Sequence, residues 1–70
     1  MMSVNDRIAA RVRQLRTDRG LALEALAEAS DVSRSMISLI ERGESSPTAV
    51  VLEKLATGLG AAAYLSLIHI

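Results

Sequence analysis

Residues 23–42 read LEALAEASDVSRSMISLIER, and the order of apolar and polar residues in this stretch decides the fold. Leu23, Leu26 and Ala27 recur at the spacing of one face of an α-helix. This pattern predicts a short helix that ends near Ala29.

A turn and a second helix follow directly. The segment Ser30-Asp31-Val32-Ser33 has the composition of a turn, and its last serine is the predicted N-cap of the next helix. That helix, over about residues 33–42, is expected to bury Ile37 and Ile40 and to end at Gly43. Two short helices joined by a turn of about four residues form a helix-turn-helix arrangement.

The spacing also predicts how the two helices pack. Leu26 and Ala27 must touch the apolar residues of the turn and of the second helix, which sets that helix at a steep angle across the first. The second helix keeps a free face, and a helix of this diameter fits the major groove of DNA. The side chains expected to face bases are Arg34, Ser35, Ser38 and Leu39.

The chemistry of these side chains suits base edges and phosphates. Arg34 can donate two hydrogen bonds to guanine O6 and N7, and Leu39 can contact a thymine methyl group. Simpler interpretations stay open. Arg34 could be a solvated surface arginine, and Leu39 could pack in the core or at a dimer interface. Contacts to phosphate, which set the register without reading sequence, are expected from Ser33, Arg42, Ser45, Ser46 and Thr48.

Two further helices flank this unit. A helix from Asn5 to about Arg19 is predicted, with Asn5 as its N-cap and Gly20 as its C′ residue. Ser46 as N-cap and Pro47 at the first helical position are predicted to start a fourth helix. The chain is therefore expected to be all-α and compact. Its predicted core consists of Ile8, Val12, Leu15, Leu26, Val32, Ile37, Ile40, Leu52, Leu55 and Leu59.

Composition excludes several kinds of chemistry. The 70 residues include no cysteine and one histidine, which excludes disulfides, thiolate chemistry and multi-histidine metal sites. No pair of carboxylates has a His, Lys or Cys placed for acid–base or nucleophilic work. We therefore predict no enzyme activity, no catalytic residue, no metal site and no cofactor.

Charge and hydropathy bear on the partner and the compartment. The formal net charge is zero, but residues 1–20 hold five arginines against two aspartates, so basic charge is concentrated in the first helix. The longest apolar stretch, residues 59–70, is shorter than the roughly 20 residues that span a bilayer, and no signal-peptide pattern opens the chain. These features favour a cytoplasmic location and no membrane partner.

The run VSRSMISLIERGESSPT at residues 32–48 is specific enough to indicate a protein family. Over about Arg7 to Gly60 the chain resembles the Cro and phage-repressor (xenobiotic-response-element, XRE) helix-turn-helix family. It most resembles the N-terminal domain of bacterial regulators that end in a cupin-type sensor. The resemblance implies a lambda-repressor-like domain of four to five helices. It also implies a transcriptional regulator, more commonly a repressor, that binds the major groove of double-stranded DNA sequence-specifically as a homodimer.

The resemblance further implies one internal contact and reveals two departures. Arg16, near the end of the first helix, is implied to pair with Glu41, near the end of the third, as a buried brace. The family usually has Ser or Thr where Ala22 stands, so the second helix is expected to lack a side-chain cap. The family also usually continues after Gly60 into a fifth helix with a recognisable apolar pattern.

The end of the chain is interpreted separately from the helix-turn-helix domain, which is assigned to residues 1–60. Residues 61–70 are predicted to be an incomplete fifth helix or an artefactual tail. Residues 65–70, LSLIHI, resemble the translation of a sequencing-adaptor end, in which case His69 has no evolved role. A C-terminal sensor or dimerisation domain would then be missing, and a small-molecule effector would act only through it. The alternative is a genuine apolar end that packs as a fifth helix.

Two other functional hypotheses stay open. An antitoxin-like module that uses the same fold would bind a partner protein, in a complex insensitive to salt. A fragment without a proper fifth helix would fold poorly and bind nothing specifically, which a cooperative thermal transition would contradict.

Overall fold

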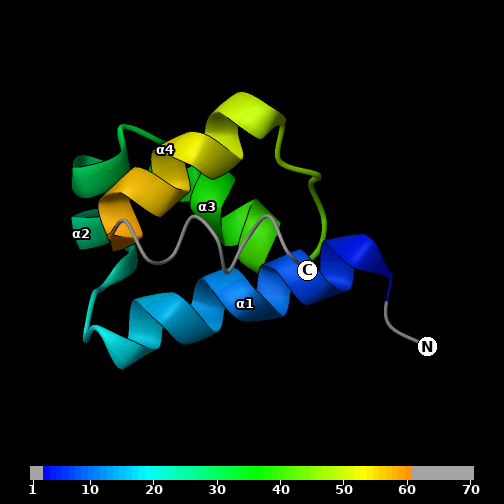
Figure 1. Cartoon of the computed structure of the whole chain (residues 1–70), viewed down its shortest axis with the longest axis horizontal. Helices are drawn as coiled ribbons and strands as arrows, with labels where there is room; N and C mark the ends of the chain where they lie inside the picture. The colour runs from blue at the N-terminus through cyan, green and yellow to red at the C-terminus, as the bar shows by residue number, and fades with distance from the viewer. Residues whose placement is uncertain (1–2, 61–70) are drawn as a thin grey trace.

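The computed structural model describes residues 3–60, and these residues form four α-helices and no strand. The helices are α1 (Val4–Asp18), α2 (Leu23–Ser30), α3 (Arg34–Glu41) and α4 (Ala49–Leu59). In Figure 1, α1 runs along one side of the molecule, and the three shorter helices gather on the other. The predicted all-α fold is confirmed. The predictions for residues 61–70, including His69, lie outside the described residues.

The first helix begins earlier than its sequence pattern predicts. The Ser3 hydroxyl accepts a hydrogen bond from the Asp6 backbone N–H at 3.1 Å, and the Asp6 carboxylate accepts one from the Ser3 N–H at 3.2 Å. This reciprocal capping box satisfies two free donors and makes Ser3 the N-cap. Asn5 as N-cap is therefore wrong, because Asn5 lies inside the helix. Gly20, with φ of +67°, follows the Arg19 C-cap as predicted.

The third helix begins and ends as predicted, whereas the second helix includes Ser30, which the sequence pattern assigns to the turn. No side-chain hydrogen bond caps the start of α2 at Ala22. At α3, the Ser33 hydroxyl accepts a hydrogen bond from the Met36 N–H at 3.1 Å. Gly43 follows the Arg42 C-cap with φ of +74°, a left-handed conformation that a residue with a Cβ adopts at a cost.

The start of α4 is displaced from its predicted position. Thr48 is the N-cap, because its hydroxyl accepts a hydrogen bond from the Val51 N–H at 3.2 Å and its backbone is extended. Helical geometry begins only at Ala49. Ser46 as N-cap and Pro47 as the first helical residue are therefore wrong, and both belong to the preceding loop.

A single apolar core joins all four helices. Eight of the ten predicted core residues are buried, and the other two, Leu15 and Leu52, are partly buried and pack against the core. Ala56 of α4 joins the core cluster, and Ala9 of α1 is also buried. The side chains that are almost completely buried are Val12, Leu26, Ile37, Ile40, Leu55 and Leu59. Helix α3 packs against α1 and α2, so the core directly supports the helix with the predicted free face.

The closest backbone approach that involves a glycine brings α4 against α2 at Gly58. A Cβ at this position would lie 2.9 Å from the Cβ and 3.0 Å from the backbone nitrogen of Ser30, which is itself buried. Ser30 cannot move away easily, because its hydroxyl donates a 2.7 Å hydrogen bond to the Leu26 carbonyl. Glycine at this position lets the two helices pack this closely.

We expect Gly58→Ala to destabilise the domain by about 1–3 kcal/mol, the usual cost of forcing extra volume into a packed interior. The sign of this stability change is informative, because alanine normally stabilises a helix interior by roughly 0.5–1 kcal/mol relative to glycine. Urea denaturation measures the change. Thr57→Ala, at the neighbouring exposed position, is the control and should change stability little. An increase in stability for Gly58→Ala would contradict the close approach.

Candidate nucleic-acid interface

Helices α2 and α3 are joined by a tight turn and share part of the core. Asp31, at the end of α2, has φ of +59°, and this left-handed residue reverses the chain toward Val32 and the Ser33 cap. Leu26 of α2 and Ile37 of α3 are both fully buried in the same cluster. The buried contacts fix α3 across α2 and turn its opposite side outward, as in a helix-turn-helix unit.

The outward side of α3 lines a hollow to which α2 also contributes. The lining residues, called here the α3 hollow, are Leu23, Arg34, Ser35, Ser38, Leu39 and Arg42. Arg34 and Ser35 are exposed, whereas Ser38 and Leu39 are partly buried. All four predicted base-facing residues thus lie together on one surface. Sequence reasoning missed Leu23, because the helical spacing places it on the apolar face of α2 with Leu26 and Ala27 and does not show that this face reaches the hollow.

Leu39 belongs to the α3 hollow rather than to the core. The partly buried side chains that pack against the core are Leu15, Leu21, Leu23, Ala27, Val51 and Leu52, so within residues 3–60 Leu39 is outside that set. Leu39 is partly buried and lines the hollow. Of the two packing alternatives, the structure does not support a place for Leu39 in the core.

The predicted phosphate-contacting residues lie just before α3 and in the segment that joins α3 to α4. Ser33 and Thr48 are exposed helix caps whose oxygens accept backbone hydrogen bonds, which leaves each hydroxyl hydrogen free to be donated. Ser45 is partly buried, and its hydroxyl contacts the Met36 sulfur at 3.8 Å. Ser46 is exposed in the same loop. The structure therefore presents three accessible hydroxyls. Those of Ser33 and Thr48 lie at the starts of α3 and α4, and that of Ser46 lies in the loop between the two helices.

Arg42 is accessible, but a carboxylate lies beside it. Its Nε lies 3.0 Å from a carboxylate oxygen of Glu44 and donates to the Ser38 carbonyl at 3.3 Å. Both side chains of the ion pair are more than half exposed, and exposed pairs contribute only about 0–1 kcal/mol. The guanidinium can therefore exchange the carboxylate for an external anion at little cost.

A largely buried ion pair ties α3 to α1. Arg16 Nε and Nη2 donate to the two carboxylate oxygens of Glu41 at 2.7 and 3.0 Å. Arg16 Nη1 also donates to the Leu21 carbonyl at 2.8 Å. The hydrogen bond with Glu41 raises the pKa of Arg16 above its ordinary value. The two residues that the family resemblance pairs thus hold the end of α3 against the first helix, with two parallel hydrogen bonds of fixed geometry.

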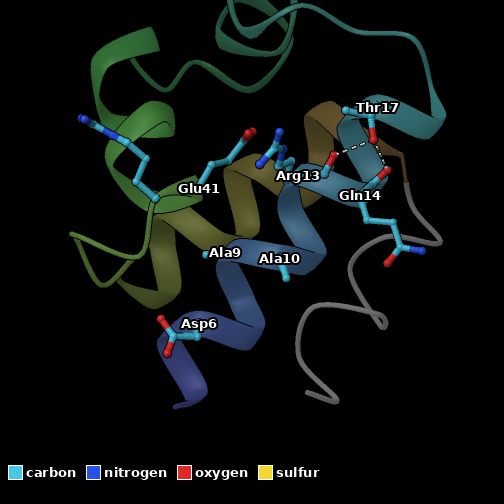
Figure 2. Close-up of a pocket in the computed structure, with 8 residues that line it drawn as sticks. Asp6, Ala9, Ala10, Arg13, Gln14, Thr17 and Glu41 are labelled. Atoms are coloured by element: carbon cyan, nitrogen blue, oxygen red, sulfur yellow. Dashed lines mark hydrogen bonds between the residues drawn. The ribbon is translucent and has the colours of Figure 1, made fainter. Parts of the chain in front are cut away.

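A second hollow lies between α1 and the end of α3, and Figure 2 shows it. Its lining residues are Asp6, Ala9, Ala10, Arg13, Gln14, Thr17, Glu41 and Arg42. The Thr17 hydroxyl points back to its own helix and donates to the Arg13 and Gln14 carbonyls. Arg42 lines both hollows, so the exposed surface beside α3 continues onto α1, where Arg13 adds positive charge.

Neither a metal-binding group nor a membrane-spanning helix is found in the described part of the chain. Within residues 3–60, no group of three or more His, Cys, Asp or Glu side chains is placed to hold a metal ion. None of the helices in that range combines the length and the apolar character that a bilayer-spanning segment needs. The α3 hollow, where all four predicted base-facing residues lie together, is the candidate site.

This geometry defines a class of protein, the helix-turn-helix domains that present one face of their second helix. Residues 12–63 match the model of the helix-turn-helix family HTH_3, and the chain belongs to this family. The membership confirms the resemblance to Cro-like and phage-repressor-like helix-turn-helix domains.

Two relatives contain this region within longer chains. The HTH-type transcriptional regulator SutR of Escherichia coli (strain K12) is 56% identical over 48 residues, which are 69% of this chain and 27% of SutR. An HTH_3 family transcriptional regulator from Vibrio cholerae has a crystal structure that superposes with a TM-score of 0.80 at 44% identity. That match covers 89% of this chain and 36% of the regulator. The chain thus spans well under half the length of either relative.

A third match has nearly the same length as this chain. The restriction-modification controller protein C.Esp1396I superposes with a TM-score of 0.84 at 26% identity, over 99% of this chain and 95% of that one. Its crystal structure is of a tetramer in complex with its natural 35-base-pair operator. The fold of this chain is therefore similar to one crystallised on DNA.

Proposed function

We propose that this chain binds double-stranded DNA sequence-specifically and acts in transcriptional regulation, with α3 in the major groove. The observation that carries the proposal is the outward face of α3, where Arg34, Ser35, Ser38 and Leu39 lie together in one hollow. The buried Arg16–Glu41 pair holds this helix in place. The HTH-type transcriptional regulators among its relatives support the same function.

Within this proposal, each contact has a separate role. Arg34 reads a guanine through O6 and N7, and Ser35 and Ser38 bond to neighbouring bases or phosphates. Phosphate contacts from Ser33, Arg42, Ser45, Ser46 and Thr48 position the domain without reading sequence. The exposed hydroxyls at the N-termini of α3 and α4 support this assignment, since helix starts favour anions.

We propose further that the domain, residues 1–60, binds as a homodimer to two half-sites about one helical turn, roughly 34 Å, apart. The tetramer of C.Esp1396I on its operator supports binding by more than one copy. Repression by blocking polymerase in the cytoplasm is the proposed mode of regulation. The 27% coverage of SutR supports a place for this domain in a longer regulator, where a small-molecule effector would act through another domain.

Arg34→Ala tests base reading directly. We expect a selection on random duplex DNA, at low and moderate salt, to enrich a motif with the natural chain. The variant should lose the preference for guanine at one position and bind the motif about five- to 150-fold more weakly, because a bidentate contact contributes roughly 1–3 kcal/mol of discrimination. Fluorescence anisotropy on the enriched motif measures the affinity.

Arg11→Ala is the matched control for this experiment. Arg11 is an exposed arginine of α1 outside the residues that line the two hollows, so its removal deletes the same charge elsewhere. It should leave the motif unchanged and reduce affinity only slightly and uniformly. If the natural chain and Arg34→Ala bind weakly, equally and without a motif, specific DNA binding by this chain is wrong.

A further inference from the structure

Leu23 has two environments. As the first residue of α2 it is partly buried and packs against the core, yet it also lines the α3 hollow together with Leu39. These two leucines come from different helices and are the apolar members of the hollow. The remaining lining residues are arginines and serines. The hollow thus combines an apolar part made by two helices with hydrogen-bonding groups around it.

We propose that Leu23 and Leu39 form a pocket for the 5-methyl group of a thymine, which makes Leu23 a specificity-determining residue of the interface. This inference rests on the proposed function, because it requires α3 to lie in the major groove. Thymine is the standard base that presents a methyl group there, while the other bases present only hydrogen-bonding atoms and ring edges. An apolar pocket favours thymine, because a donor or acceptor placed against it would lose its hydrogen bond to water.

The two-helix arrangement explains why Leu39 alone is not the whole pocket. A methyl group against a single side chain keeps much of its surface in water, and the hydrophobic gain scales with the apolar area removed from water. Leu23 supplies a second apolar surface in the same hollow. Its packing against the core also holds it in place, so little side-chain entropy is lost on binding.

The position of the thymine relative to the guanine follows from helix geometry. Arg34 and Leu39 are five residues apart in α3, which is about 7.5 Å along the helix axis. Successive bases of one strand rise by about 3.4 Å. We therefore expect the thymine within about two base pairs of the guanine that Arg34 reads.

Replacing thymine with uracil tests the pocket, since it removes the methyl group and leaves the hydrogen-bonding edge unchanged. Duplexes carrying the selected motif are made with uracil at each thymine in turn, and affinities are compared by fluorescence anisotropy. The natural chain should bind about fourfold more weakly when one particular thymine is replaced, the effect of one buried methyl-sized group. Leu23→Ala should reduce this thymine-to-uracil affinity ratio toward one, with only the Leu39 contact remaining, while keeping the preference for the guanine.

Two further variants separate the pocket from a general loss of stability. Leu21→Ala removes another partly buried leucine that packs against the core but does not line the α3 hollow, and it should keep the full thymine-to-uracil ratio. Leu23→Met conserves the volume and should keep both the fold and the ratio. Equal binding of thymine and uracil at every position, or a full ratio in Leu23→Ala, overturns the pocket while the selected motif still supports DNA binding. If no motif is selected, both proposals are wrong.

Discussion

Replacing Glu41 with alanine is expected to lower the free energy of unfolding by about 3–5 kcal/mol, the usual result of breaking a buried ion pair on one side. Arg16, whose side chain is only 15% exposed, would keep its charge without a carboxylate beside it. An arginine cannot relieve this by losing its proton, because its pKa is far above neutral pH. A domain of this size has only a few kcal/mol of net stability, so the variant should be largely unfolded.

Far-ultraviolet circular dichroism during a urea titration measures this loss, and Glu44→Ala is its control. Glu44 pairs with Arg42 at 3.0 Å, but both side chains are more than half exposed. Its removal should change stability by less than about 1 kcal/mol. The combination of Arg16→Met with Glu41→Leu should recover most of the lost stability, since it leaves no unpaired buried charge. Equal effects of Glu41→Ala and Glu44→Ala would contradict the buried brace.

Ile37→Ala is expected to cost about 2–5 kcal/mol, because it removes three carbon atoms from a fully buried site and leaves a cavity. Ile37 belongs to the cluster that contains Leu26 of α2 and Leu55 of α4. The cavity would therefore open where several helices meet, and these neighbours cannot all move in to fill it. A thermal melt should show a transition that is much lower or no longer cooperative.

Ile37→Val tests whether this loss scales with the volume removed. Deleting a single methyl group should cost about 0.5–1.5 kcal/mol and preserve a cooperative melt. DNA binding should follow stability in both variants, because Ile37 faces the core and not the hollow. Arg34→Ala should show the opposite combination, with an unchanged melt and lost base preference. If Ile37→Ala melted like the natural chain, the position of α3 on the core would be wrong.

The predictions that held from sequence alone rest on local or periodic signals. The third helix was correctly predicted from its Ser33 cap and from Gly43, since each acts within a few residues of the helix end. Apolar periodicity identified the core, because side chains on one face of a helix must be buried together. The two wrong N-caps had the same cause. Several residues near each helix start have side chains that can cap it. Ser3 and Thr48 are the caps, rather than Asn5 and Ser46, because the backbone is extended at these two residues and becomes helical directly after them.

The sequence by itself thus determined the helix-turn-helix unit, its buried side and the four outward residues of α3. Only the tertiary structure decided that Leu23 lines the same hollow as Leu39. The physical reason is that periodicity assigns a side chain to a face of its own helix. What lies opposite that face depends on where the next helix crosses. The position of α3 is set by the core that it shares with α2 and by the Arg16–Glu41 pair that ties it to α1.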